Sequence, residues 1–348
     1  MSDLLLKDFA PRPSIITELS TVDRPKFPAI DAHNHLGYRT NAFGEPIDGA
    51  GTGWMDGVDR LVSIMDQCDV KCMANLTGRW GDDLAKLIEQ FEERYPGRFY
   101  TLANVNWSLS EDLRFGEKAA AELERSVRAG ARGLKIFKNL GLRVRDGSGK
   151  LIMPDDERLT PLWEKAGELG IPVLIHVADP AAFFTPLDRH NPAYLGLKRR
   201  PEWHFYGNDY PSFMGLIEAG IRLISRHPQT TFITAHTGWY SENLKFVGQQ
   251  MLDQLPNMYT DFSARIGPLG IQPHTAREFF INYQDRILFG TDMTPSPQMY
   301  QAYFRFLETA DDYFESSPGG ARIYGLHLPD DVLAKVYYKN AEKVIPGL

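Results

Sequence analysis

The stretch AIDAHNHLG, residues 29–37, decides how the rest of the chain can be interpreted. Side chains alternate between the two faces of an extended strand, so His33 and His35 project to the same side. The apolar residues before them predict a buried strand, and Gly37 indicates its end. Two imidazoles at one strand tip suit a metal ion, but a His-x-His pair is also common as two hydrogen-bonded histidines. Residues elsewhere in the chain must distinguish these alternatives.

The bulk composition is that of an ordinary globular protein. Of its 348 residues, 43% are hydrophobic and 24% are charged, and the formal net charge is -7. No basic run exceeds Lys198-Arg199-Arg200, which argues against a nucleic-acid partner. No apolar run approaches the ~18 residues that a membrane span needs, so we expect no membrane partner. A small molecule is the expected partner.

Residues 1–26 are expected to form an extension before the folded domain. Their apolar run of three leucines is too short for a signal peptide, so we expect a cytoplasmic protein unless a signal peptide has been removed. Cys68 and Cys72 are four residues apart, a spacing that suits neither a structural zinc ion nor a disulfide framework. We expect both to be buried apolar residues.

From residue 27 to residue 348 strands and helices alternate with a regularity that predicts a single domain. The expected strands lie at residues 27–31, 70–76, 99–106, 133–138, 172–177, 231–236, 258–263 and 286–292. This repeat, with several continuous apolar strands, predicts a closed parallel (β/α)8 TIM barrel. A doubly wound sheet is the alternative. Residues 178–210, rich in proline and aromatic residues, are expected to be an insertion after strand five that covers the site.

Metal-compatible side chains recur at the predicted strand ends, where TIM barrels place their functional residues. His33 and His35 end strand one, His176 strand five, His236 strand six and Asp292 strand eight. Each alone has an ordinary explanation, because a histidine at a strand tip is often only hydrogen-bonded and Asp292 could cap a turn. Together they predict a site for one divalent ion, zinc first and manganese second, with a position left for water.

Four motifs resemble those of the amidohydrolase superfamily over about residues 27–345: DAHNH at 31–35, IH at 175–176, TAH at 234–236 and ILFGTD at 287–292. Within it the chain resembles the amidohydrolase-2 group, which contains lactone and amide hydrolases and non-oxidative decarboxylases. The resemblance implies that His33, His35, His176 and Asp292 hold one metal ion. It also implies that His236 is a catalytic group beside them and that the protein is a homodimer.

The expected mechanism follows from the chemistry of such a site. A divalent ion lowers the pKa of bound water from 15.7 to about 7, which provides a nucleophile at neutral pH. Asp292 would take the proton and deliver it to the leaving group, while His236 would stabilise the developing oxyanion. We therefore expect a metal-dependent hydrolase that cleaves a lactone, ester or amide bond of a small acidic substrate. A metal-dependent decarboxylase (carboxy-lyase) of an aromatic or unsaturated acid is the alternative, and a non-catalytic barrel that binds a metal or ligand is a third.

Four further residues near strand ends are expected to contact the substrate: Lys135, Arg265, Trp107 and Trp239. Lys135, on strand four, is predicted to be an ammonium group that faces an acidic substrate group. Its alternative, implied by the resemblance, is a carbamylated lysine that bridges two metal ions, which would make His236 a ligand of the second. Arg265 could bind a carboxylate bidentately or pair with Asp261.

Overall fold

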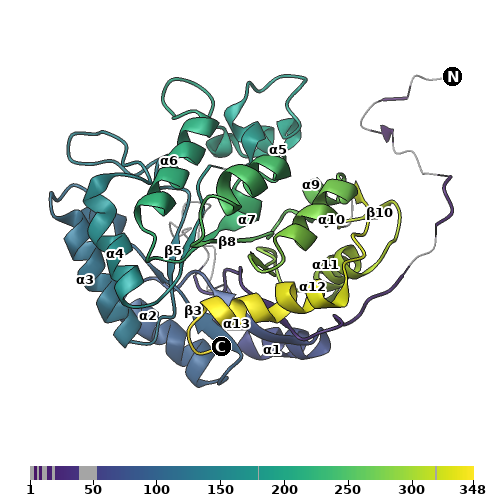
Figure 1. Ribbon diagram of the computed structural model, residues 1–348, viewed down its shortest axis with the longest axis horizontal. Helices are drawn as coiled ribbons and strands as arrows, with labels where there is room; N and C mark the ends of the chain where they lie inside the picture. Colours follow the sequence, from purple (N-terminus) through teal and green to yellow (C-terminus); the bar gives the residue numbers. More distant parts are fainter. Residues whose placement is uncertain are drawn as a thin grey trace.

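The computed structural model describes residues 4–5, 8–9, 14–17, 20–38, 53–178, 180–317 and 320–348. Parts of the predicted 1–26 extension therefore lie outside the described residues. Figure 1 shows the strands at the centre and helices on both sides of them. The strands are β1 (Ala29–Asp31), β2 (Val70–Asn75), β3 (Phe99–Thr101), β4 (Ala103–Asn104), β5 (Leu134–Ile136), β6 (Val173–Ile175), β7 (Phe232–Thr234), β8 (Met258–Asp261), β9 (Ile287–Leu288), β10 (Phe314–Glu315) and β11 (Arg322–Ile323).

Helical segments separate the strands, and short 3-10 and π segments, labelled η, extend or connect them. The helices are α1 (Val58–Gln67), α2 (Gly81–Ile88), α3 (Phe115–Arg128), α4 (Thr160–Glu168), α5 (Tyr194–Arg199), α6 (Phe213–Arg226), α7 (Ala235–Gly238), α8 (Leu244–Phe246), α9 (Ile266–Gly270), α10 (Pro273–Asn282), α11 (Pro297–Glu308), α12 (Asp330–Ala334) and α13 (Asn340–Val344). The η segments are η2 (Glu89–Glu93), η3 (Trp107–Leu109), η4 (Glu157–Leu159), η5 (Ala181–Phe184), η6 (Pro201–Trp203), η7 (Val247–Leu252) and η8 (Lys335–Lys339). In the described part of the chain, none of the helices combines the length and the apolar character that crossing a bilayer requires.

The strands β1 to β9 are parallel and neighbour one another in chain order, in sheets of three and six strands. Only Leu102 separates β3 from β4. Its N–H donates a hydrogen bond of ordinary length, 3.0 Å, to the Asn75 carbonyl of β2. The first strand, β1, meets the last parallel strand, β9, where the Ala32 N–H donates to the Phe289 carbonyl at 2.9 Å. Because a doubly wound sheet would break the chain order of the strands, this arrangement is the predicted TIM barrel.

Two hydrophobic clusters result from the alternation of strand side chains. The smaller one contains strand residues and residues near the C-terminus, and it fills the barrel interior with side chains such as those of Ile30, Cys72, Leu174, Ile233, Tyr259 and Leu288. The larger one lies between the strands and the surrounding helices. Cys68 and Cys72 are buried and not disulfide-bonded, which confirms their predicted role as apolar residues.

The helix α6 illustrates how the sequence produces the outer layer. It begins after Ser212, whose hydroxyl accepts the Gly215 N–H as an N-cap. Its buried residues include Leu216, Gly220 and Leu223, which recur three or four positions apart and form one apolar stripe. This stripe packs towards the barrel and leaves the opposite face to solvent.

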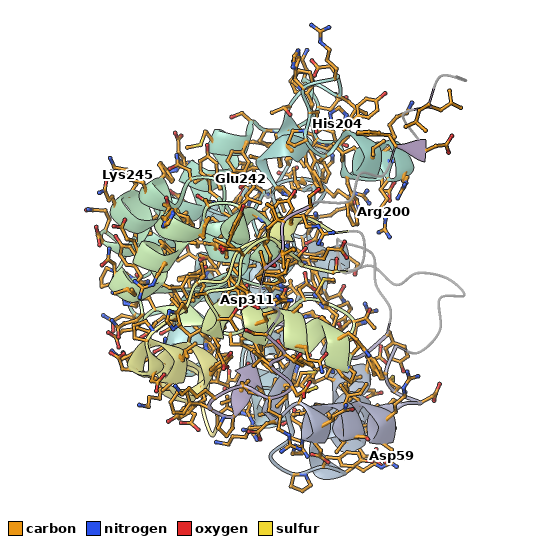
Figure 2. All side chains as sticks on the ribbon, turned by 90° about the vertical axis from the view of Figure 1, so that its right-hand side faces the viewer. Asp59, Arg200, His204, Glu242, Lys245 and Asp311 are labelled. Carbon is orange, nitrogen blue, oxygen red and sulfur yellow. The ribbon has the colours of Figure 1, made fainter. Side chains whose placement is uncertain are left out.

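Residues 178–210 connect β6 to α6 and contain η5, α5 and η6. The ammonium of Lys138, just after β5, lies 5.3 Å from the ring centroid of Phe183, 5.2 Å from that of Trp203 and 5.8 Å from that of Phe205. These cation–π contacts tie the segment to the end of β5. Figure 2 shows His204 and Arg200 of this segment at the opposite end of the molecule from Asp59 in α1.

Replacing Ile233 with alanine is expected to lower the free energy of unfolding by about 2–5 kcal/mol, because it leaves a cavity inside the barrel. Ile233 is 0% exposed, whereas Ile271 is 65% exposed and provides a matched control. Guanidinium denaturation of both variants measures the difference, and Ile271→Ala should stay within about 0.5 kcal/mol of the wild type. Equal destabilisation by the two changes would contradict the assigned interior cluster.

Candidate metal centre

His33 and His35 lie in the segment directly after β1. Their rings meet edge to face, with centroids 5.7 Å apart. His33 is completely buried, whereas His35 is partly exposed. Desolvation, followed by electrostatic interactions with Lys135 and His33, holds the pKa of His35 well below its ordinary value. The His35 ring is therefore neutral and offers a lone pair to a metal ion.

Asp292 follows β9 and adopts the left-handed backbone conformation, with φ of +48°. Its N–H donates to the His33 carbonyl at 2.7 Å, which fixes it beside the two histidines. Asp292 Oδ1 lies 3.5 Å from His35 Nε2, and Oδ2 lies 3.9 Å from His33 Nε2. Potential ligand atoms of these side chains all lie within 4.8 Å of one another. The fold thus brings His33, His35 and Asp292 together as a group that could hold a metal ion.

The buried carboxylate of Asp31 joins β1 to the loop that carries Asp292. It accepts hydrogen bonds from the Thr291 N–H (3.0 Å), the Thr291 hydroxyl (2.7 Å) and the Tyr300 hydroxyl (2.9 Å). Burial raises the pKa of Asp31, while these donors favour its ionised form. Because Thr291 immediately precedes Asp292, these bonds set the spacing between Asp292 and the residues that follow β1.

Asp261, at the end of β8, orients His33. Its Oδ2 accepts a hydrogen bond from His33 Nδ1 at 2.8 Å. An ionised carboxylate only accepts, so the proton lies on Nδ1 and the Nε2 lone pair points towards Asp292. Burial opposes the ionisation of Asp261, but its electrostatic interaction with His33 and the hydrogen bond from that ring outweigh that effect and lower the pKa of Asp261.

Asp261 also organises the residues around His236. Its Oδ1 accepts from the His236 N–H (3.0 Å), the Ser263 N–H (3.0 Å) and the Ser263 hydroxyl (2.5 Å). From the sequence, Asp261 was expected only as a possible partner for Arg265, and no role was predicted for Ser263. The available signal was the position of an acidic residue at the end of a predicted barrel strand.

His236 lies in a left-handed helical turn directly after β7, labelled α7 in Figure 1. Residues 236–239 have φ between +58° and +65°, a conformation that costs non-glycine residues about 1–2 kcal/mol each. The Gly238 N–H donates to Thr260 Oγ1 at 2.8 Å, which helps to hold the turn. The turn directs His236 Nε2 to within 3.8 Å of Asp292 Oδ2.

His176 follows β6, and its ring packs against the ring of His236 with centroids 4.4 Å apart. The His236 ring in turn lies 5.1 Å from that of His33. Burial, followed by the charges of Lys138 and Lys135, holds the pKa of His176 well below its ordinary value. His176 is therefore a neutral ring beside the group of His33, His35 and Asp292, and its role as fourth ligand stays a prediction.

Lys135 in β5 is buried at the centre of the site. Its Nζ lies 3.4 Å from His33 Nε2 and 5.5 Å from the ring centroid of Phe137. Burial lowers the pKa of Lys135 to about 8, although the charges of Asp292 and Asp261 act in the opposite direction. The predicted cation is thus adjacent to the candidate ligands, where either an acidic substrate group or a carbamate could engage it.

Trp239, which the sequence analysis expected to contact substrate, is completely buried. Its indole N–H donates to the Ile175 carbonyl at 2.9 Å, and a Cβ added to Gly220 of α6 would lie 2.4 Å from its ring. The left-handed turn therefore directs this side chain towards the helix layer. We correct the expectation accordingly: Trp239 positions the chain beside His176 and His236 and does not line the substrate site.

The other two predicted substrate residues lie in different surroundings. Trp107 begins η3 after β4 and lines a cavity of about 620 Å³. Arg265 follows β8, where its Nη1 donates to the Ala264 carbonyl at 2.8 Å. A separate cavity of about 550 Å³ is lined by His35 and Asp292. Substrate contacts by Trp107 and Arg265 stay predictions.

The chemistry of the donor set fits a divalent ion. Neutral imidazoles and a carboxylate oxygen are ligands for zinc and for other first-row ions. The hydrogen bond from His33 to Asp261 is the carboxylate–histidine arrangement that commonly supports a metal ligand. These contacts, rather than the His-x-His spacing alone, make a purely structural histidine pair the weaker explanation.

The Amidohydro_2 family model, described as amidohydrolase, matches residues 85–347, which is most of the chain. The chain belongs to this amidohydrolase family. The matched part contains Lys135, His176, His236 and Asp292, while the stretch at residues 29–37 precedes it. A comparison with curated proteins found no match.

Solved structures share the fold of this chain over most of its length. The 2,6-dihydroxybenzoate decarboxylase from Rhizobium has 14% identity and a TM-score of 0.59, covering 91% of this chain and 98% of that chain. A dihydroxybenzoic acid decarboxylase from Polaromonas sp. JS666, with bound manganese and the inhibitor 2-nitroresorcinol, has 17% identity and a TM-score of 0.56, covering 91% and 96%. The 4-oxalomesaconate hydratase from Rhodopseudomonas palustris has 16% identity and a TM-score of 0.54, covering 91% and 95%. At these identities the likeness shows the fold alone.

Elemental analysis of the purified protein should find about one divalent ion per chain in the wild type. His33→Ala and Asp292→Ala should lose it, because each removes a ligand from the converging group. His274→Ala, in the exposed part of α10, is the matched control and should retain it. Retention of the ion in both site variants would contradict the assigned centre, and two ions per chain would favour a carbamylated Lys135.

Asp261→Asn is expected to weaken metal affinity by about 10- to 100-fold, because the amide supports the His33 ring less well than the carboxylate does. Competition with a chromophoric chelator measures this change. Asp285→Asn, which alters an exposed carboxylate paired with Lys335, is the control. Unchanged affinity in Asp261→Asn would show that its bond to His33 does not support a metal ligand.

Proposed function

We propose that this amidohydrolase family member is a metal-dependent hydrolase that cleaves a lactone, ester or amide bond of a small acidic substrate. The observation that supports it best is the position of the Asp292 carboxylate. Its oxygens lie 3.5 Å from His35 Nε2, 3.9 Å from His33 Nε2 and 3.8 Å from His236 Nε2. This position supports a role for the Asp292 carboxylate both in holding a metal ion and in proton transfer.

His33, His35, His176 and Asp292 would hold the ion, with zinc proposed first and manganese second. A bound divalent ion would supply a Lewis acid and bring the pKa of water close to neutrality. Manganese in the Polaromonas decarboxylase structure supports the second choice. We propose one ion, with Lys135 uncarbamylated, because His33, His35 and Asp292 converge as one group of potential ligands among the described residues.

Asp292 would accept a proton from the attacking water and pass it to the leaving group. His236 is prepared for a complementary task, because its Nδ1 lies 2.7 Å from the Ser263 carbonyl. A carbonyl only accepts, so the proton resides on Nδ1 and Nε2 is the atom that exchanges protons at the Asp292 side. Protonated at Nε2, His236 would donate a hydrogen bond to an oxygen that develops negative charge.

The position of Lys135 supports the proposal that the substrate is acidic. Its buried side chain places a cation within the ring of candidate ligands, and an anionic substrate group would compensate that charge. Arg265 is a second positive charge near the site, because its charge is one of those that lower the pKa of His176. We propose that these two residues select a substrate with a carboxylate near the bond that reacts.

Non-oxidative decarboxylation is the second candidate, and the position of Lys135 favours it as well. A substrate carboxylate beside Lys135 would leave as carbon dioxide when its C–C bond breaks, and Asp292, protonated beforehand by solvent, would give that proton to the carbon. Two of the structures with this fold are decarboxylases of dihydroxybenzoates. The same residues would thus act without consuming water.

Incubation of metal-loaded enzyme in 18O-labelled water, with a panel of lactones, esters, amides and hydroxybenzoates, tests the proposal. Hydrolysis should place one labelled oxygen in the acid product, whereas decarboxylation should release carbon dioxide and leave the organic product unlabelled. Turnover of hydroxybenzoates alone would replace the leading proposal by the second one. No turnover of any compound by metal-loaded enzyme would count against both.

His236→Asn should reduce kcat by about 10²- to 10⁴-fold while the metal content stays near that of the wild type, because His236 is assigned to proton transfer rather than to the ion. His274→Asn is the matched control and should leave kcat unchanged. Steady-state kinetics with parallel elemental analysis provide both readouts. Loss of the metal in His236→Asn would instead place His236 among the ligands.

A further inference from the structure

The segment that follows His35 is joined to the end of β2 by buried hydrogen bonds. Asn75, the last residue of β2, is completely buried. Its Oδ1 accepts three backbone N–H groups, those of Leu36 (3.2 Å), Gly37 (3.2 Å) and Thr77 (3.1 Å). One amide oxygen therefore fixes the backbone on both sides of the contact between the two segments.

Gly37 allows the two segments to approach each other closely. A Cβ added to Gly37 would lie 2.7 Å from the Thr77 carbonyl oxygen, closer than such atoms approach in proteins. A residue with a side chain would therefore push the end of β2 away from the segment that carries His35. The glycine that was expected only to end strand one thus also sets the distance between His35 and Thr77.

This approach places the Thr77 hydroxyl at the edge of the His35 ring. Thr77 is completely buried, and its Oγ1 lies 3.1 Å from His35 Nδ1, which is within hydrogen-bonding distance. The other ring nitrogen, Nε2, lies 3.5 Å from Asp292 Oδ1. The Phe137 ring stacks on the face of the His35 ring, with centroids 5.4 Å apart. The ring is therefore held at its edge and on its face, with Nε2 towards Asp292.

The two histidines of the candidate centre have different supports. The Asp261 carboxylate only accepts hydrogen bonds, so it fixes the proton of His33 on Nδ1. A hydroxyl both donates and accepts, so Thr77 keeps its bond to His35 Nδ1 whichever ring nitrogen carries the proton. With an ion at Nε2, the proton would lie on Nδ1 and Thr77 would accept it. The contact with Thr77 is thus compatible with the metal-free and the metal-loaded protein.

We propose that Thr77 is a positioning residue, whose hydroxyl holds the His35 ring with Nε2 towards Asp292 before a metal ion binds. Asn75 in turn holds the backbone of Thr77. A ring that is already oriented loses less conformational freedom when it becomes a ligand, so this arrangement favours metal binding. The inference rests on the proposed function for the presence of the ion, and it adds the end of β2 to the parts of the barrel that prepare the centre.

Thr77→Val removes the hydroxyl and keeps a side chain of similar shape. It should weaken the binding of zinc and of manganese by about 10- to 100-fold, measured by competition with a chromophoric chelator. Thr77→Ala should behave in the same way, whereas Thr77→Ser should restore most of the affinity. Equal metal affinity in the wild type and in the variants without the hydroxyl would overturn the inference.

Thr230→Val is the matched control. Thr230 is also buried, and its hydroxyl donates to the Trp163 carbonyl at 2.8 Å. It precedes β7 and therefore lies at the opposite end of the barrel from the candidate ligands. Its replacement should lower the melting temperature and leave the metal affinity unchanged, so it separates a loss of stability from a loss of positioning.

NMR of the metal-free protein with 15N-labelled histidine tests the contact without an ion. Thr77→Val should shift the signals of the His35 ring nitrogens, which are assigned by their loss in His35→Asn. Thr77→Ser and Thr230→Val should leave these signals near their wild-type positions, and thermal melts verify that each variant is folded. Signals that do not respond to Thr77→Val would overturn the inference. Metal binding that depends on Thr77, with no turnover of any compound, would instead count against the proposed function and leave the inference supported.

Discussion

The closure of the barrel between β9 and β1 is the constraint on which the candidate site depends. Backbone hydrogen bonds from Ala32 to Phe289 and from Asp292 to His33 join the two ends of the domain at 2.9 and 2.7 Å. Asp31 reinforces the same seam by accepting the Thr291 N–H and hydroxyl. A carboxylate near the C-terminal end of the chain is thereby held beside two histidines near its start. Any change that opens this seam separates the candidate ligands.

Two aspartates are buried near this seam, and the cost of burying each carboxylate is offset by different contacts. Asp31 is surrounded by neutral donors, and burial raises its pKa. Asp261 faces His33, and the electrostatic interaction and hydrogen bond with that ring lower the pKa of Asp261 despite burial. An ionised buried carboxylate is stable only when paired and fully hydrogen-bonded. Asp261 meets that condition and, in doing so, fixes the tautomer of His33, so electrostatic compensation and ligand orientation result from the same contacts.

The sequence was sufficient to predict the barrel, because apolar strands, helix N-caps and glycines at helix ends can each be recognised from neighbouring residues. The tertiary structure favours the same elements. It also placed His33, His35 and Asp292 at one rim, since strand ends of a parallel barrel share one edge. The position of Asp261 at the end of a strand was a signal that could have been used, but the contacts of Ser263 and the direction of Trp239 were not predictable in this way. Trp239 lies in a left-handed turn at residues 236–239, which involves three non-glycine residues and is held by a contact that is distant in sequence. The same turn directs Trp239 away from the site that its position after β7 suggested.

Anomalous diffraction from crystals grown with zinc or with manganese tests the central claim most directly. We expect one anomalous peak per chain, about 2.0–2.2 Å from His33 Nε2, His35 Nε2 and an Asp292 oxygen, with His176 as the fourth protein ligand. In that structure the Lys135 ammonium would remain unmodified. A pair of peaks bridged by a modified Lys135, or a single peak away from the Asp292 carboxylate, would contradict the account.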